Sequence, residues 1–329
     1  MSSTQVTPTD LQEVVEELRS GERFLLTTHE NPDGDALGSL LAMHQILGAL
    51  GKDSIMFLGA KEFPLPVEYR FLPLEEVFHE PPADLADRTV IFLDCGNIDR
   101  MPVDWLSNGT RVINIDHHHD NTRFGDVNLV DVEASCTAEI VYELTGLLGV
   151  DLTPEVANAL YVGLVTDTGK FMYENTDARS HRMAAALLEA GVQVNDVYRR
   201  LYEHAPIEKL KLLARALEKI ELHGQGALAI TYISAADYAA TGGGEVLTEG
   251  IIDHVRTIDG ALIAAVVRDQ QGSRTARKVS LRSTDGSVDV SEIARKQGGG
   301  GHRRAAGFGT DLDYERILAF LRAELSRAG

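Results

Sequence analysis

The chain has 329 residues and a formal net charge of −19 at pH 7, and 44% of its residues are hydrophobic. This length allows two domains with separate cores, and the composition is typical of a globular protein. No apolar run approaches the roughly 20 residues that span a bilayer, so we expect no membrane partner. The negative charge argues against a long, nonspecific grip on duplex DNA, because such binding depends on Lys and Arg.

The first residues have neither the basic region nor the apolar region of a secretion signal, which predicts a cytoplasmic protein. The two cysteines, Cys95 and Cys136, lie in apolar surroundings, and we expect both to stay reduced. For Cys95, a buried structural thiol is favoured over a catalytic nucleophile.

The first half of the sequence alternates short apolar runs with helical patterns. Strands are predicted at residues 24–28, 90–94 and 112–116, and helices at residues 36–50, 137–148 and 154–165. The last helix has a good start, with Thr153 as the capping residue and Pro154 in the first turn. This alternation favours a parallel sheet with helices on both faces.

A helical pattern over residues 194–222, rich in Lys, Arg and Glu, predicts a linker between two domains. Beyond it, strands are predicted at 227–233, 262–268 and 278–282, and helices at 246–257, 290–297 and 314–327. The expected fold is therefore α/β, with an N-terminal parallel-sheet domain, a helical linker and a smaller C-terminal α/β domain with a mixed sheet. The expected boundaries are 1–193, 194–224 and 225–329.

Four acidic or histidine-bearing stretches each follow an apolar run. They are residues 29–35, Asp94, residues 116–118 and Asp167. In a parallel sheet the carboxyl ends of the strands collect ligands, so these side chains are expected to gather there. Carboxylates brought together in this way would repel one another without a cation, and hard oxygen and imidazole ligands suit Mn²⁺, Mg²⁺ or Zn²⁺. The pattern predicts a two-metal hydrolase.

Each stretch also has a structural alternative. Residues 29–35 could form an ordinary turn in which Asp35 caps the next helix, and Asp94 could be a simple strand-end cap. Residues 116–120 have no packing rationale, although a polar surface loop is an alternative. Asp167 is predicted near the negative end of a helix, where an anion is disfavoured by a few tenths to about 1 kcal/mol unless a cation is bound.

Basic residues concentrate in the second half of the chain. Between Arg268 and Arg304 there are nine basic and four acidic residues, around the glycine run 298–301. This stretch is either a solvated face or an anion-binding surface. The glycines could present backbone N–H groups to a phosphate or let a base approach the main chain, with a flexible linker as the alternative.

The order His-x-Asn-Pro-Asp-x-Asp, strand-terminal Asp, Asp-His-His and Asp-Thr-Gly resembles the DHH phosphoesterases. The sequence Gly-Gly-Gly-Gly-His at 298–302, followed by Ala-Ala-Gly at 305–307, is similar to the signature of the C-terminal domain in one branch. The length and layout are closest to the nanoRNase branch, which contains bifunctional oligoribonucleases and 3′-phosphoadenosine-5′-phosphate (pAp) phosphatases.

The resemblance implies two metal ions, usually Mn²⁺, with Mg²⁺ or Co²⁺ as alternatives. One ion would be held by His29 and Asp33, the other by Asp35, His117 and Asp167, with Asp94 bridging both. Asp94 and His118 would be the catalytic residues, and His118 would face the scissile phosphate as a hydrogen-bond or proton donor. At His119 relatives often carry a different residue, which leaves a one-residue ambiguity over which histidines bind metal.

The resemblance further implies that the C-terminal domain binds the substrate through Arg282, Gly299, Gly300, Gly301, His302 and Arg303. Arg282 or Arg303 could pair with a terminal phosphate, and His302 could stack on or hydrogen-bond to a base. The expected partners are short single-stranded RNA, linear dinucleotides such as pApA, and pAp. The expected activity is hydrolysis of these nucleotides, and a homodimer is compatible with the resemblance.

Four alternatives remain at this point. A cyclic di-AMP phosphodiesterase belongs to the same branch, whereas a single-strand DNA exonuclease of the RecJ type usually carries additional domains. A manganese inorganic pyrophosphatase is disfavoured by the glycine run, because pyrophosphate has no base to recognise. A silent nucleotide-binding module is disfavoured because every expected ligand is present.

Overall fold

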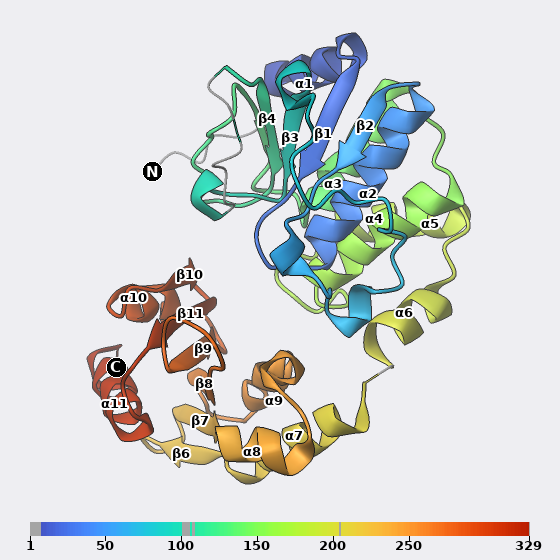
Figure 1. The fold of residues 1–329 in the computed structure, drawn as a ribbon. Helices are drawn as coiled ribbons and strands as arrows, with labels where there is room; N and C mark the ends of the chain where they lie inside the picture. Colours follow the sequence, from blue (N-terminus) through green and yellow to red (C-terminus); the bar gives the residue numbers. More distant parts are fainter. Residues whose placement is uncertain (1–7, 101–105, 107–108, 204, 329) are drawn as a thin grey trace. The chain divides into compact units, whose positions relative to one another are not determined.

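Two separate sheets organise the residues that the computed structural model describes, which are residues 8–100, 106, 109–203 and 205–328 (Figure 1). One sheet belongs to the unit formed by residues 1–204 and the other to the unit formed by residues 205–329. Across these described residues, none of the helices combines the length and the apolar character needed to cross a membrane.

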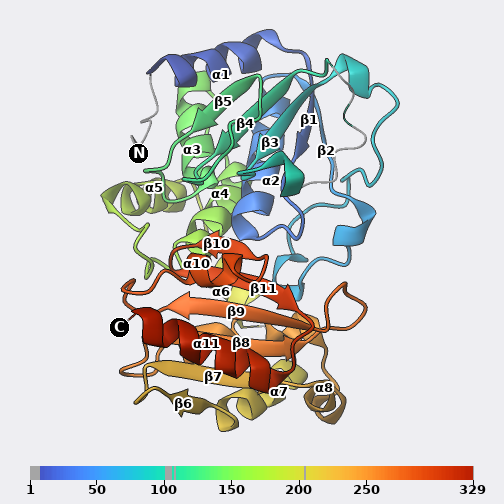
Figure 2. The same cartoon turned by 90° about the vertical axis from the view of Figure 1, so that its left-hand side faces the viewer.

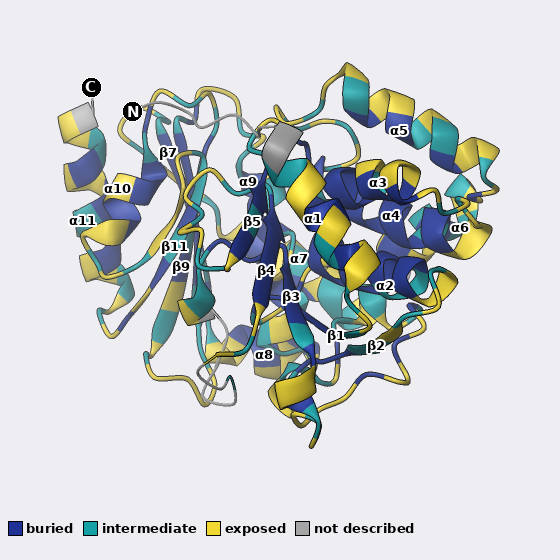
Figure 3. Cartoon of the chain, turned by 90° about the horizontal axis from the view of Figure 1, so that it is seen from above, coloured by how far each residue is buried: buried dark blue, intermediate teal, exposed yellow. Residues whose placement is uncertain are grey.

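The N-terminal sheet, as far as the chain is described, has five parallel strands in the order β2-β1-β3-β4-β5 (Figure 2). The strands are β1 (Arg23–Thr27), β2 (Asp53–Met56), β3 (Thr89–Leu93), β4 (Val112–Asp116) and β5 (Val127–Val130). The central strands are largely buried (Figure 3), as expected of a parallel sheet covered on both faces.

Alternate residues of the N-terminal strands point to opposite faces. Leu26 and Ile91 join the main core, against helices on one face, whereas Leu25 and Val90 join a smaller cluster on the other. The second face is covered by the 3-10 helix η3 (Leu85–Asp87) and by loop residues. The predicted parallel sheet is therefore confirmed, with α-helices packed on one face and a short 3-10 helix and loops on the other.

The helices of the N-terminal unit are α1 (Pro8–Ser20), α2 (Gly34–Ala49), α3 (Thr137–Leu148), α4 (Pro154–Asp167), α5 (Ala178–Glu189) and α6 (Val194–Tyr202). Short 3-10 helices lie at η1 (Ala60–Glu62), η2 (Val67–Tyr69) and η4 (Ile98–Arg100). The start of α4 is as predicted, because the Thr153 side chain accepts a hydrogen bond from the N–H of Val156 and Pro154 lies in the first turn.

The C-terminal sheet is mixed, as predicted, and its strands follow the order β10-β11-β9-β8-β7-β6. Only the β7–β8 pair is parallel among the pairs in the described part of the chain. The strands are β6 (Glu221–His223), β7 (Leu228–Ile233), β8 (Ile263–Asp269), β9 (Arg277–Ser283), β10 (Gly300–His302) and β11 (Ala305–Thr310).

Helices cover both faces of the C-terminal sheet. The core on one face contains residues of α10 (Val290–Arg295) and α11 (Tyr314–Ala328). The core on the other face contains residues of α7 (Ile207–Glu218), α8 (Ala235–Thr241) and α9 (Ile251–Val255).

Two predicted helices are wrong in their extent. The helix predicted over 194–222 is divided into α6, α7 and strand β6, because Pro206 cannot continue a helix and lies at the start of α7 instead. The helix predicted over 246–257 is divided into η5 (Glu245–Thr248) and α9 by Gly250, which has a φ of +84°. The three-part division with a linker at 194–224 stays a prediction, and its helices α6 and α7 belong to different units.

Candidate metal centre

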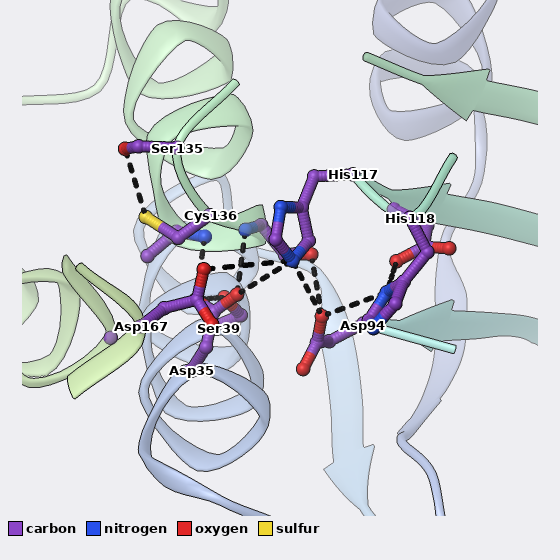
Figure 4. Close-up of polar contacts among 12 residues, drawn as sticks. Asp35, Ser39, Asp94, His117, His118, Ser135, Cys136 and Asp167 are labelled. Atoms are coloured by element: carbon purple, nitrogen blue, oxygen red, sulfur yellow. Dashed lines mark hydrogen bonds and ion pairs between the residues drawn. The ribbon is translucent and has the colours of Figure 1, made fainter. Parts of the chain in front are cut away.

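All six predicted metal ligands lie at one edge of the N-terminal sheet, where β1, β3 and β4 end. Asp94 directly follows β3, and His117 directly follows β4. The loop after β1 and the first turn of α2 supply His29, Asp33 and Asp35, and the last residue of α4 is Asp167. Figure 4 shows Asp35, Asp94 and Asp167 directed toward the His117 ring.

The first group consists of His29, Asp33 and Asp94, whose ligand atoms lie within 4.8 Å of one another. Nε2 of His29 is 3.6 Å from Oδ2 of Asp94. Nδ1 of His29 is 2.8 Å from the carbonyl oxygen of Glu30, so Nδ1 carries a proton and Nε2 is left as a donor atom for a metal.

Asp33 is also the N-cap residue of α2. Its Oδ1 accepts hydrogen bonds from the backbone N–H groups of Asp35 and Ala36, at 3.0 and 3.1 Å, and thereby caps α2. The alternative in which Asp35 caps this helix is therefore wrong. The carboxylate of Asp35 is instead buried and points toward α3.

The second group consists of Asp35, His117 and Asp167, again with ligand atoms within 4.8 Å of one another. Nε2 of His117 is 3.7 Å from Oδ1 of Asp94, 3.8 Å from Oδ2 of Asp167 and 4.0 Å from Oδ2 of Asp35. These separations are too long for hydrogen bonds. They suit a set of donors arranged around a cation.

The charges of this cluster are unbalanced without a cation. Burial raises the pKa of Asp35 well above its ordinary value, and the nearby carboxylates of Asp94 and Asp167 raise it further. Burial raises the pKa of Asp167 to about 7, against the opposing effect of His117. Burial also opposes ionisation of Asp94, but the neighbouring imidazole of His29 and the charges of His118 and His117 keep its pKa below the usual range. A divalent cation would balance these carboxylates, so the residues fit a metal.

Asn175, which the sequence patterns did not identify, supports Asp167. Its Nδ2 donates to Oδ2 of Asp167 at 3.0 Å and to the carbonyl oxygen of Ser135 at 2.7 Å. The amide therefore connects the end of α4 to the segment that precedes α3. Because Asn175 lies in a turn without a repeating pattern, no sequence signal points to this role.

His118 is held differently from His117. Its Nδ1 lies 2.7 Å from Oδ1 of the buried Asp116, whose other oxygen accepts a 2.5 Å hydrogen bond from Asn121. Burial opposes ionisation of Asp116, but the hydrogen bond and charge of His118 lower its pKa. His119 is exposed and belongs to none of the ligand groups found among the described residues.

Both cysteines lie near the cluster but are buried and reduced, as expected. Burial raises the pKa of the Cys136 thiol well above its ordinary value, and the charge of Asp35 raises it further. The Cys95 sulfur is 3.2 Å from the carbonyl oxygen of Asn97. Buried thiols of this kind are poor nucleophiles.

The residues predicted to bind substrate lie on neighbouring strands of the C-terminal sheet. Ala305 of β11 is in register with His302 of β10 on one side and with Arg282 of β9 on the other. Their neighbours Leu281 and Ala306 point into the core, so Arg282 and His302 share the opposite face. Arg303 directly follows β10, and its Nε donates to the carbonyl oxygen of Gly286 at 3.3 Å.

The glycine run is ordered rather than a flexible linker. A Cβ at Gly299 would clash with the carbonyl oxygen of Gly307, and one at Gly301 would lie 2.5 Å from that of Ala305. Gly300 is exposed and has no neighbour within 4 Å of such a Cβ. The close pairing of β10 and β11 therefore requires two of these glycines but not Gly300.

Comparison with known protein families gives one match in the N-terminal unit and one in the C-terminal unit. Residues 23–164 match the model of the DHH family, N-terminal domain, and residues 238–327 match the DHHA1 domain. The bifunctional oligoribonuclease and PAP phosphatase NrnA of Thermus thermophilus is 36% identical, over 92% of this chain and 90% of its own length. The chain belongs to the DHH family. The resemblance predicted from the motifs is thus confirmed.

One further relative and two solved structures are also similar to this chain. The protein of the same name from Bacillus subtilis is 28% identical, over 94% of this chain and 96% of its own length. An exopolyphosphatase-related protein from Bacteroides fragilis shares the fold, with a TM-score of 0.88 and 20% identity over 99% of this chain and 98% of its own. RecJ of Thermus thermophilus, solved in complex with Mn²⁺, has a TM-score of 0.57 and 18% identity over 98% of this chain and 55% of its own.

Proposed function

We propose that this DHH-family protein is a metal-dependent phosphoesterase that hydrolyses short oligoribonucleotides and linear dinucleotides such as pApA to mononucleotides. We extend the proposal to removal of the 3′-phosphate of pAp. The observation that carries it is the pair of donor groups that meet at Asp94, one with His29 and one beside His117. The proposal is also supported by sequence similarity, because 92% of this chain aligns with a protein named bifunctional oligoribonuclease and PAP phosphatase.

In this proposal the cluster holds two cations. His29 and Asp33 would hold one ion, Asp35, His117 and Asp167 would hold the other, and Asp94 would be shared by both. Two divalent ions, when bound, supply an activated water and offset the charge of the phosphate. The oxygen and imidazole donors suit Mn²⁺, and Mg²⁺ or Co²⁺ are alternatives.

His118 is the proposed proton or hydrogen-bond donor to the phosphate ester. The carboxylate of Asp116 holds its Nδ1 at 2.7 Å, which fixes the ring and stabilises the doubly protonated form. Phosphoryl transfer depends mainly on positioning and charge stabilisation. A covalent nucleophile is therefore unnecessary, which agrees with the burial of both cysteines.

The C-terminal unit is the proposed nucleotide-binding part. It contains 17 of the 31 Lys and Arg residues but only 16 of the 50 Asp and Glu residues, so the negative charge of the chain belongs to the N-terminal unit. Arg282 can pair with a phosphate through two parallel hydrogen bonds, and His302 lies on the same sheet face. Gly299 and Gly301 hold β10 against β11, Gly300 leaves space for a ligand, and Arg303 adds positive charge.

The test is a hydrolysis panel with chelator-treated protein to which Mn²⁺ is returned. The substrates are a five-nucleotide RNA, pApA, cyclic di-AMP, pAp and pyrophosphate. Release of mononucleotides from the RNA or pApA, and loss of phosphate from pAp, is the expected result. Turnover of pyrophosphate alone, or of no substrate, would contradict the proposal. Turnover of cyclic di-AMP alone would assign the protein to the alternative diesterase activity.

Two variants separate the proposed roles of the units. Asp94→Ala is expected to abolish hydrolysis of every substrate, because it removes the shared ligand. His302→Ala is expected to spare hydrolysis of bis-p-nitrophenyl phosphate, which has no nucleobase, while raising KM for pApA. Equal losses on both substrates in His302→Ala would contradict nucleotide recognition by this face. The cytoplasmic location and the homodimer stay predictions.

A further inference from the structure

Thr137, the first residue of α3, belongs to neither ligand group, but it contacts two of the clustered carboxylates. Its hydroxyl donates to Oδ1 of Asp94 at 3.0 Å, and its backbone N–H donates to Oδ2 of Asp35 at 2.7 Å. The N–H of Ala138 donates to Oδ1 of Asp35 at 2.9 Å. Thr137 is completely buried, so these contacts are shielded from water.

The local sequence explains why α3 makes these contacts. The first N–H groups of a helix have no partner within the helix, and they are usually satisfied by the side chain of the N-cap residue. Here the N-cap is Cys136, whose side chain makes no capping hydrogen bond. The carboxylate of Asp35, from the neighbouring helix α2, takes this place and lies at the positive end of the helix dipole.

The hydroxyl of Thr137 also distinguishes the two oxygens of Asp94. Oδ2 lies 3.6 Å from Nε2 of His29, and Oδ1 lies 3.7 Å from Nε2 of His117. Thr137 donates only to Oδ1, the oxygen on the His117 side. A carboxylate with one oxygen fixed in this way cannot rotate freely about its terminal bond.

We propose that Thr137 is a positioning residue that maintains the affinity of the cation site formed by Asp35, His117 and Asp167. It does so by fixing the Asp94 carboxylate and by holding Asp35 through the backbone. This inference rests on the proposed binding of two metal ions. Oδ2 of Asp94, which lies on the His29 side, receives no hydrogen bond from Thr137, so the site at His29 and Asp33 should depend less on the Thr137 hydroxyl.

The experiment measures Mn²⁺ binding to the chelator-treated full chain by calorimetry, with bound and free Mn²⁺ counted separately by EPR. Thr137→Val keeps the shape of the side chain but removes the hydroxyl, and Thr137→Ser keeps the hydroxyl. We expect Thr137→Val to weaken one of two Mn²⁺ sites by roughly 10- to 100-fold, the range found for residues that support metal ligands. Thr137→Ser should restore that affinity to within a few-fold of the wild type.

Thr145→Val is the matched control on the same helix. Thr145 is also buried, but its hydroxyl bonds to the carbonyl oxygen of Val141, at 2.9 Å, and not to the cluster. This variant should bind both ions as the wild type does. Thr137→Ala provides a second way to remove the hydroxyl if valine disturbs folding, which thermal unfolding in chelator will reveal.

Three results would overturn the inference. Wild-type affinity at both sites in Thr137→Val and Thr137→Ala would mean that the hydroxyl has no positioning role. An equal weakening of both sites would mean that the hydroxyl does not act on the Asp35, His117 and Asp167 site in particular. Loss of affinity in Thr137→Ser equal to that in Thr137→Val would assign the effect to packing instead. A wild-type chain that binds no Mn²⁺ would overturn the proposed metal centre itself, and this result is distinguishable from the others.

Discussion

The buried Asp116 pairs with the partly buried His118, with Oδ1 of the aspartate 2.7 Å from Nδ1 of the histidine. Asn121 donates to the other oxygen of Asp116 at 2.5 Å and to Oδ1 of Asn114 at 2.7 Å, so the carboxylate is fixed from both sides. The contact with Asp116 restricts rotation of the His118 ring. It also allows the ring to carry a proton on both nitrogens, which a proton donor to a phosphate ester requires.

Asp116→Asn removes the charge that stabilises this doubly protonated form while keeping the shape of the side chain. We expect kcat for pApA to fall by roughly 10²- to 10⁴-fold, the usual contribution of a general acid. KM and the affinity for Mn²⁺ should change little. His119→Ala, at the next histidine in the chain, is the control and should retain wild-type kcat. A parallel loss of Mn²⁺ affinity in Asp116→Asn would show that Asp116 acts through the metal ligands instead.

Metal removal should destabilise the protein, because the buried carboxylates around Asp94 repel one another when no cation is bound. We expect Mn²⁺ to raise the Tm of chelator-treated protein, since a ligand at 1,000 times its Kd stabilises the folded state by about 4 kcal/mol per site. Differential scanning fluorimetry against Mn²⁺ concentration measures the effect. In Asp94→Ala, which lacks the residue proposed to be shared by both ions, the increase should be largely lost. An equal increase in this variant would place the bound Mn²⁺ elsewhere.

The clustering of the proposed ligands was predictable from the sequence because they lie at the ends of apolar runs. Asp94 and His117 continue buried strands, and parallel strands bring their carboxyl ends to one edge. The supporting residues were not predictable, because their contacts join distant segments. Thr137 meets Asp94 across 43 positions, and Asn175 meets Ser135 across 40. Such pairs depend on how helices pack, which no local pattern encodes.

Strands β10 and β11 and the division of one predicted helix were missed because the local sequence there is atypical. Strand β10 contains two glycines and no β-branched or aliphatic residue, and β11 contains two more glycines, with only Phe308 and Thr310 of the types that favour strands. Their pairing depends on the close approach that Gly299 and Gly301 allow. The hydrophobic periodicity over 194–222 runs across Pro206 without a break, but an α-helix cannot continue through this proline.

The glycine run allows a sharp comparison between neighbouring positions. Gly300→Ala should leave Tm unchanged, because nothing lies within 4 Å of the added methyl group. We expect it to raise KM for pApA several-fold if a nucleotide approaches the main chain there. Gly299→Ala should instead lower the stability by roughly 1–3 kcal/mol, the usual cost of overpacking, because its methyl group would clash with the carbonyl oxygen of Gly307. Unchanged KM in Gly300→Ala would remove this glycine from the substrate site.

Asp237 of α8 predicts how the stability of the C-terminal unit depends on pH. Its carboxylate is buried and accepts 2.6 Å hydrogen bonds from Lys219 at both oxygens, together with a 2.8 Å bond from the N–H of Ser234. Burial alone would raise the pKa of Asp237, but Lys219 and Ser234 outweigh it and lower the pKa to about 2. Because the folded pKa lies below the ordinary value of 3.8, the stabilisation is present above about pH 4 and is lost between pH 4 and 2.

Asp237→Asn removes this charge but keeps an oxygen that can accept from Ser234. We expect it to lower the free energy of unfolding by about 2 kcal/mol at pH 7, and the difference from the wild type should disappear as the pH falls toward 2. Urea unfolding of the full chain at several pH values measures both. Asp196→Asn is the control, because its pairs with Arg199 and Arg200 are exposed and screened by solvent, so its effect should be much smaller. A difference between wild type and Asp237→Asn that persists at pH 2 would show that packing, and not the charge, carries the stabilisation.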